Sequence, residues 1–286
     1  MKRIVFWLVA LGLSRATAQV TVEVTQDQDS FLPGESLPVA VRITNLSGQT
    51  LHLGRETNWL AFSVESRDGG VVAPDCEPMV AGEFDLESSK AAIKRVDLAP
   101  CISPGKAGRY SIIATVRIPQ WDHEIASPPK GFDVIDGARI WDQVVGVPKT
   151  SGDTNAAPEL RRYILQEANQ LRGRLRLYLR LTDATGGRVF RVVAIGPMHS
   201  FSRPEPQVDK YSKLHLLYAD GPHSCSYSVF NPDGEMLIRR TYDFGESRPR
   251  LKVDEGGNYA VIGGIRRATL RDVPSPKPDD SETRKP

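Results

Sequence analysis

Residues 202–209 read SRPEPQVD, and residues 247–254, 45 positions further on, read SRPRLKVD, so that five of the eight positions are identical. Turn-type residues and a strand pattern follow each copy, at 213–218 and at 258–262. The recurrence favours a structural role, because a reaction needs one site whereas a repeated fold repeats its turns. We expect the two arginines of the motif to pair with its aspartates or to bind loop carbonyls. The motif positions are Ser202, Arg203, Pro204, Asp209, Ser247, Arg248, Pro249 and Asp254.

A longer self-match surrounds this motif. Residues 163–195 and 214–245 share one order of strands, loops and turns, with an offset of about 50 residues. In the first unit, residues 174–181 alternate leucine with other residues, which is typical of a half-buried strand. Each unit is therefore expected to be an antiparallel meander of about four strands, with a period in the range of propeller blades.

The repeat region resembles β-propeller blades, loosely those of sialidase-like extracellular proteins. It departs from them at Asn231–Gly234, a turn that no tryptophan follows, whereas their Asp-box turns carry one. About two blades and a fragment are present, and a closed propeller needs at least about four blades. A small open stack of sheets, a divergent sandwich and closure between chains all remain open.

Residues 19–136 show short alternating strands between turn signals, as in a β-sandwich. Pro33-Gly34-Glu35 marks one turn, and residues 110–118 form the clearest strand. Its alternation places five residues on one face, namely Tyr110, Ile112, Ala114, Val116 and Ile118. The turn, together with Gly105–Tyr110 before the long strand, resembles bacterial immunoglobulin-like domains. That resemblance implies a spacer, adhesion or binding module and implies no reaction.

The first 18 residues have the pattern of a secretory signal. Lys2 and Arg3 precede an apolar run from Ile4 to Leu13, and Ala16-Thr17-Ala18 supplies small residues, so we predict cleavage after Ala18. The run is too short for a stable bilayer anchor, which needs about 20 residues. We therefore expect a secreted or periplasmic protein with no stable membrane anchor after signal cleavage.

These patterns predict an all-β fold class and divide the chain into five segments. They are a signal peptide at 1–18, an immunoglobulin-like β-sandwich at 19–136, a linker at 137–158, a propeller-like β-repeat domain at 159–268 and a disordered tail at 269–286.

Charge and motif content restrict the classes of function. The chain has 37 basic and 35 acidic residues, and loss of Lys2, Arg3 and Arg15 with the signal leaves it nearly neutral. Such a balance argues against a bulk nucleic-acid binder. The sequence has no Gly-x-Ser-x-Gly, no His-Glu-x-x-His and no phosphate loop. We therefore predict that the protein has no cofactor, and we assign no catalytic residue.

Three cysteines follow the signal. Cys76 and Cys101 each lie in a proline-flanked loop, and an oxidising compartment allows either a disulfide between them or two unpaired thiols. Cys225 shares a strand face with Tyr227 and Val229, which favours a small buried hydrophobic residue over a nucleophile.

One basic cluster is a candidate ligand site. Arg174, Arg176 and Arg180 share the outer face of one strand and could contact an anionic glycan or phosphate. More often, an arginine-rich outer face keeps a sheet edge soluble and unpaired.

Other polar clusters give no metal site. Residues 121–124 (Trp-Asp-His-Glu) fit a solvated loop, and Asp27 with Asp29 has too few oxygens for calcium. His199, His215 and His223 match no zinc spacing, and we expect His215 at the surface.

Two functional hypotheses follow. The first is a non-catalytic exported binding, adhesion or scaffold protein whose partner is a protein or a glycan, with homo-oligomerisation as one route to closing the repeat. The second is an exported glycan-acting hydrolase or its accessory module, which would need two carboxylates about 5 to 10 Å apart in a pocket.

Overall fold

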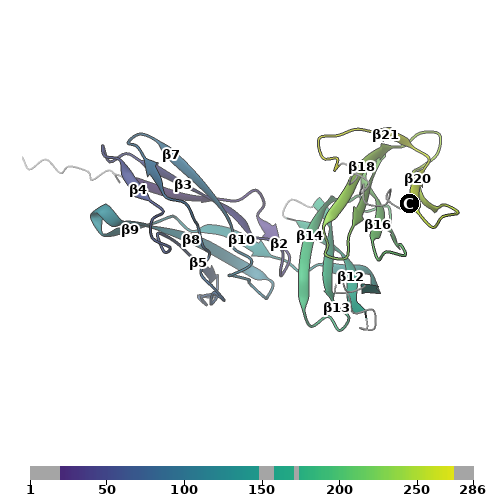
Figure 1. The fold of residues 1–286 in the computed structure, drawn as a ribbon, viewed down its shortest axis with the longest axis horizontal. Coiled ribbons are helices and arrows are strands. Elements are labelled where there is room, and N and C mark those ends of the chain that lie inside the picture. The colour runs from purple at the N-terminus through teal and green to yellow at the C-terminus, as the bar shows by residue number, and fades with distance from the viewer. Residues whose placement is uncertain (1–19, 148–157, 171–173, 274–286) are drawn as a thin grey trace, which may run out of the picture.

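The computed structural model describes residues 20–147, 158–170 and 174–273, and every regular element longer than three residues in them is a β-strand. Figure 1 shows two parts, with β1–β10 in the first and β11–β21 in the second. The paired strands are antiparallel except for β2 (Ser30–Phe31) and β10 (Lys130–Val134), which run parallel. The predicted all-β fold class is confirmed. The predicted signal peptide and residues 274–286 of the predicted tail lie outside the described residues. The prediction of a disordered tail is wrong over 269–273, because Asp272 bonds to Arg266 and Thr269, and Val273 forms a bridge with Arg239.

Three sheets build the N-terminal part. The first has the order β1-β3-β7, with β1 (Val20–Thr25), β3 (Pro38–Asn45) and β7 (Ala91–Asp97). The second has the order β2-β10-β8-β5, with β5 (Leu60–Ser66), β8 (Gly108–Ile118) and, paired to β8, β9 (His123–Ala126). The third pairs β4 (Leu51–Leu53) with β6 (Phe84–Leu86), and a short 3-10 helix, η1 (Pro119–Trp121), follows β8.

Alternating side chains from these sheets form one core. The five residues predicted to share a face in 110–118 are all buried there, so that prediction is confirmed. Trp59 is fully buried, and its indole N–H donates to the Val80 carbonyl at 2.9 Å. This bond satisfies the polar atom of the largest side chain in the core.

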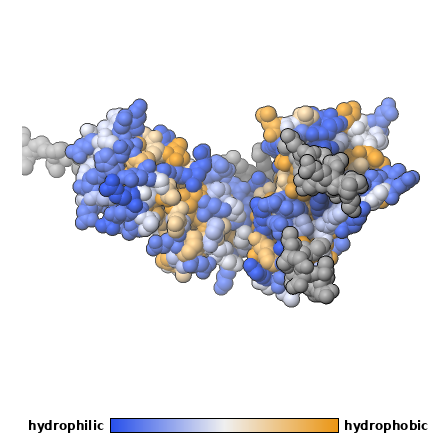
Figure 2. Space-filling model, in the orientation of Figure 1, coloured by the Kyte–Doolittle hydropathy of each residue, from blue (hydrophilic) through white to orange (hydrophobic). Residues whose placement is uncertain are grey.

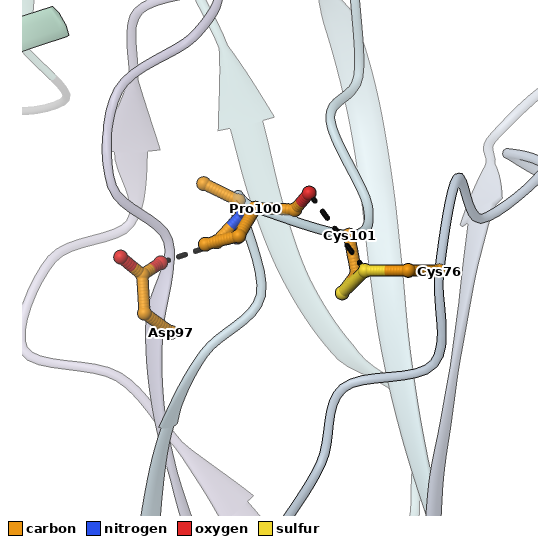
Figure 3. Close-up of a disulfide and its surroundings, with 5 residues drawn as sticks. Cys76, Asp97, Pro100 and Cys101 are labelled. Atoms are coloured by element: carbon orange, nitrogen blue, oxygen red, sulfur yellow. Dashed lines mark hydrogen bonds between the residues drawn. A yellow bond between two sulfur atoms is a disulfide. The ribbon is translucent and has the colours of Figure 1, made fainter.

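A disulfide joins Cys76 to Cys101, with the two Cα atoms 4.6 Å apart (Figure 3). The Asp75 N–H donates to the Cys101 carbonyl at 2.7 Å, and the Cys101 N–H donates to Leu98 at 3.0 Å. The irregular segment around Cys76 is thereby held against the turn that follows β7.

Two meanders and a hairpin build the C-terminal part. The first meander has the order β11-β12-β13-β14, with β11 (Ala138–Val147), β12 (Glu159–Gln170), β13 (Arg174–Asp183) and β14 (Val189–Pro197). The second has the order β15-β16-β17-β18, with β15 (Glu205–Val208), β16 (Leu214–Gly221), β17 (Ser224–Phe230) and β18 (Met236–Asp243). The hairpin pairs β19 (Arg250–Val253) with β20 (Tyr259–Ile262), and β21 (Ile265–Arg267) returns to pair with β18.

The predicted linker at 137–158 is wrong over 138–147, which form the ten-residue strand β11. The strand contains a bulge, because its register against β12 shifts between Arg139 and Trp141 and leaves Ile140 as the extra residue. A bulge breaks the period-two alternation by which a strand is recognised in a sequence.

The meanders and the hairpin stack as three layers. Leucines of β12 and β13 pack against Leu214, Leu216 and Phe230 of the second meander in one core. The other face of the second meander packs against Leu251 and Val261 of the hairpin. Neither face of β16 is open to solvent, which identifies the second meander as the middle layer.

The middle layer corrects the expectation for His215, which is buried and not at the surface. Its Nε2 lies 3.1 Å from Asp209 Oδ2, and its Nδ1 lies 2.8 Å from the Tyr227 hydroxyl. The ring of Tyr259, from the hairpin, lies over the imidazole at 4.9 Å between ring centres. A polar side chain on a strand is usually expected at the surface. Here the hairpin of β19 and β20 covers the face of β16 on which His215 lies.

The repeated motif ends in an aspartate that organises a hairpin loop. Asp209 Oδ1 accepts the Lys213 N–H at 2.9 Å, and Asp254 Oδ1 accepts the Asn258 N–H at 2.8 Å. Asn231 makes the same bond to the Glu235 N–H, at 2.8 Å. In each loop the first residue also donates its own N–H to the carbonyl four positions on, so the side-chain bond reinforces the closure of the hairpin. These positions therefore have a structural role in the turn.

Candidate ligand-binding groove

The predicted arginine site lies at the junction between the two parts of the molecule. Arg176 Nη1 donates to Gln28 Oε1 at 2.7 Å, and Arg180 Nη1 donates to the Pro33 carbonyl at 2.9 Å. Both guanidinium groups are therefore bound within the chain. The side chain of Arg174 lies outside what the structure describes. The sequence could not show that the outer face of β13 is covered, because the covering residues lie more than 140 positions away.

Apolar side chains complete this junction. Leu32 and Ile135, from the N-terminal part, pack with Ala168, Tyr178 and Val192 of the first meander. The predicted turn at Pro33-Gly34-Glu35 is present, with the Glu35 N–H donating to the Leu32 carbonyl at 3.0 Å. The N-terminal part therefore covers the outer face of the first meander at β12, β13 and β14.

Glu35 is a buried carboxylate at this junction. It accepts hydrogen bonds from the Leu32 N–H at 2.8 Å and from Gln28 Nε2 at 2.9 Å. Burial raises the pKa of its carboxyl above the ordinary value of 4.5, although these bonds and the charge of Arg176 act in the opposite direction. Since the folded-state pKa exceeds the unfolded one, stability is gained as the pH falls through the raised pKa, and the gain is complete below pH 4.5.

We therefore expect Glu35→Gln, which is neutral at every pH, to gain stability relative to the wild type as the pH rises from 4.5 to neutrality. The measurement is the melting temperature of both proteins across this range. Glu87→Gln, which removes an exposed carboxylate, serves as the control. Parallel curves for Glu35→Gln and the wild type would contradict the assignment.

A groove of about 580 Å³ opens between the first meander and the connection from β14 to β15. Its floor includes the buried side chains Leu165 and Met198. Two charged residues, Glu167 and Arg203, and two hydroxyls, Ser200 and Ser202, line it. The remaining lining residues are apolar, namely Ile140, Trp141, Pro204 and Pro206. Small-molecule and peptide sites have this composition, in which a few polar groups orient a ligand on apolar walls.

The connection from β14 to β15 is anchored on both layers. The Met198 N–H donates to the Leu175 carbonyl at 2.9 Å, and the His199 N–H donates to the Ala219 carbonyl at 2.9 Å. The Ser202 N–H then closes a turn on the His199 carbonyl at 3.4 Å. Phe201, at the tip of the connection, is 92% exposed, and the centre of its ring lies 5.5 Å from the centre of the His199 ring. A pinned loop that presents an exposed aromatic ring is typical of a recognition surface.

The two copies of the repeated arginine have different surroundings. Arg203 lines the groove and forms no ion pair or hydrogen bond with another described residue. Arg248 lies over the ring of Phe244 at 5.2 Å, so its charge rests on an aromatic face. The sequence led us to expect that these arginines pair with the motif aspartates. Neither of them does so among the described residues. The repeat thus supplies one arginine to the groove and one to packing.

The other polar clusters singled out in the sequence are not brought together as sites. Asp29 pairs with Lys130 at 3.0 Å, and Asp122 pairs with Arg117 at 3.3 Å. Within the described ranges, no group of three or more His, Cys, Asp or Glu residues could hold a metal ion. Cys225 is buried as predicted, and burial raises the pKa of its thiol to about 11, so it is a poor nucleophile.

A second hollow, of about 670 Å³, runs along the junction, where it includes Arg180, Phe190 and Asp97. Arg180 is bound to the Pro33 carbonyl, and Asp97 accepts hydrogen bonds from Ser36 and Leu37. A second arginine, Arg191, also lines this hollow, but the carboxylate of the hollow is already bonded, so we regard the groove as the better candidate. Figure 2 shows apolar patches among a mostly hydrophilic surface on both parts of the molecule.

Comparison with protein families and with curated proteins gave no match to this chain. Among the described residues, no helix is long and apolar enough to cross a lipid bilayer.

Proposed function

We propose that this protein is an exported, non-catalytic binding protein whose ligand occupies the groove beside Arg203. The observation that carries the proposal is an accessible groove with two charged side chains, Glu167 and Arg203, that have no partner among the described residues. Charged groups in stable folds are usually paired or fully solvated. Here Glu167 is half-buried and Arg203 is exposed, and both line the groove, so a ligand in the groove can pair with both charges.

The architecture supports the same function. We propose that residues 19–136 form an immunoglobulin-like sandwich and that 159–268, extended by β11, form a divergent propeller-like array. The Tyr110 hydroxyl donates to the Lys106 carbonyl at 2.9 Å, as in tyrosine corners of such sandwiches. Stacked four-stranded meanders resemble blades, with the hairpin as the fragment of a third. Both architectures present loops on a rigid scaffold.

Export is part of the proposal. Residues 1–18 have the signal pattern, and the disulfide between Cys76 and Cys101 is compatible with an oxidising compartment outside the cytoplasm. We propose a secreted or periplasmic location on these two grounds.

A hydrolase remains the competing hypothesis, and the groove favours binding over it. Among the described residues, one carboxylate lines the groove, that of Glu167, whereas glycosidases position two about 5 to 10 Å apart. A glycan substrate whose cleavage by the wild type is abolished in Glu167→Gln would overturn the proposal.

The repeat supplies a matched control for the binding test. The full chain is screened against a random peptide library and a glycan array, and the strongest ligand is carried forward. We expect Arg203→Asp to weaken binding by about tenfold or more, since a hydrogen bond to a charged group contributes about 1.5 to 3 kcal/mol. Arg248→Asp, the equivalent change outside the groove, is expected to bind as the wild type does. Equal affinity of all three proteins for every ligand found would contradict the groove as the site.

A further inference from the structure

The groove lies beside a sheet edge with free backbone groups. β11 is the terminal strand of its sheet and pairs with β12 from Ala138↔Glu167 to Val147↔Glu159. On its other side, the described residues cover only the far end, where Ser212 Oγ donates to the Gly146 carbonyl at 2.7 Å. Between residues 139 and 145, the outward N–H and C=O groups have no described protein partner. An edge of this kind is a template for another strand.

The composition of this edge protects it only in part. Proteins protect edges with lysine, proline, other charged side chains, bulges or short strands. β11 has one bulge and two charged residues, Arg139 and Asp142, which pair with each other, but it is ten residues long and contains neither lysine nor proline. Ile140 and Val144 are exposed, and Ile140 is the bulged residue that also lines the groove. Bulges next to binding sites re-aim a side chain, and here the bulge brings the edge and the groove together.

The groove wall favours a peptide over a sugar. A pyranose stacks on an aromatic face and needs many polar groups. Trp141 lines the groove but packs against the core between the two meanders, and the exposed ring of Phe201, on the adjoining connection, is not among the lining residues. Half of the lining residues are aliphatic, methionine or proline, which suits an apolar side chain. Glu167 and Arg203 stand unpaired on the same groove, so they complement a basic and an acidic side chain beside that apolar one.

We propose that β11 accepts an extended peptide segment of a partner protein as an added strand, with an apolar side chain of that peptide in the groove and flanking charges on Glu167 and Arg203. This inference rests on the proposed function and names its ligand class. Successive side chains of a strand point to opposite faces, so the apolar and charged residues of the peptide would occupy alternate positions. Main-chain bonds to β11 would supply affinity, and the groove would supply selectivity.

The test uses the strongest peptide from the random library and the full chain. Each backbone amide of the peptide is methylated in turn, and affinity is measured by calorimetry. In strand addition every second N–H pairs with β11, so we expect alternating positions to lose about tenfold or more while their neighbours lose little. Charge reversal is the second arm of the test. We expect Arg203→Asp to lower the affinity for the peptide. Changing the acidic residue of the peptide to lysine should restore the affinity for this variant.

The outcomes separate this inference from the proposed function. Peptides that need Arg203 but tolerate methylation at every position would overturn strand addition and leave the groove as a binding site. If glycans bind and need Arg203 while no peptide binds, the groove remains the binding site and the inference that its ligand is a peptide is overturned. Absence of any ligand in both screens would overturn the inference and the proposed function together.

Discussion

Replacing Cys76 and Cys101 together by serine is expected to lower the free energy of unfolding of the N-terminal part by about 3 kcal/mol. The disulfide closes a loop with a sequence separation of 25 residues, and the chain entropy of the unfolded state rises when that loop is released. The loop contains β6, β7 and the second part of the irregular segment between β5 and β6, residues 77–83, which has few backbone bonds of its own. The Cys101 side chain is buried, so its replacement also disturbs the packing around Leu98 and Ile102.

The measurement is thermal unfolding of the wild type and of the double variant, with and without dithiothreitol. The reductant should lower the melting temperature of the wild type and leave the variant unchanged. Cys225→Ser is the control for cysteine replacement, because Cys225 is the free cysteine of the described chain. A wild type that melts at the same temperature with and without reductant would show that the disulfide does not stabilise the fold.

Tyr163→Ala is expected to have an effect at least as large, lowering the stability of the C-terminal part by about 3 to 5 kcal/mol. Tyr163 lies on β12, is fully buried between the two meanders, and donates its hydroxyl to the Ser212 carbonyl at 2.7 Å. Ser212 in turn bonds to Gly146 of β11. The substitution would leave a cavity in the core and release the loop that holds the second meander against β11.

Tyr163→Phe separates these two contributions. It retains the ring and removes the hydroxyl, so it should cost about 1 kcal/mol for one buried hydrogen bond. Urea unfolding of both variants, followed by circular dichroism, gives the two free energies. Equal losses in the two variants would mean that the hydroxyl contributes the stability and that packing of the ring does not.

Regular alternation is the part of this fold that the sequence reveals. Residues 110–118 alternate without interruption, and their apolar face is the buried face of β8. The repeated Asp209 and Asp254 also have local roles, because each caps the loop that it begins. Such features depend on neighbours within a few positions, and therefore a sequence pattern contains them.

The groove could not be read in the same way. Trp141, Glu167 and Met198 come from three separate strands or connections, and nothing in their spacing brings them together. β11 was hidden by its bulge, and the arginines of β13 were covered by residues from the other part of the chain. The sequence points to one residue of the groove, Arg203, through the repeated motif. Because the motif recurs, it favours a structural role for this arginine, but only its second copy, Arg248, packs on an aromatic ring.

The central claim is that a ligand binds at the groove and the adjoining edge of β11. Backbone amide exchange of the full chain, with and without the strongest ligand from the screens, tests it most directly. We predict slower exchange in residues 139–145 and 198–205 when the ligand is bound, and little change on the exposed face of β1, β3 and β7. Protection confined to that face, or to the junction around Glu35 and Arg176, would contradict the claim.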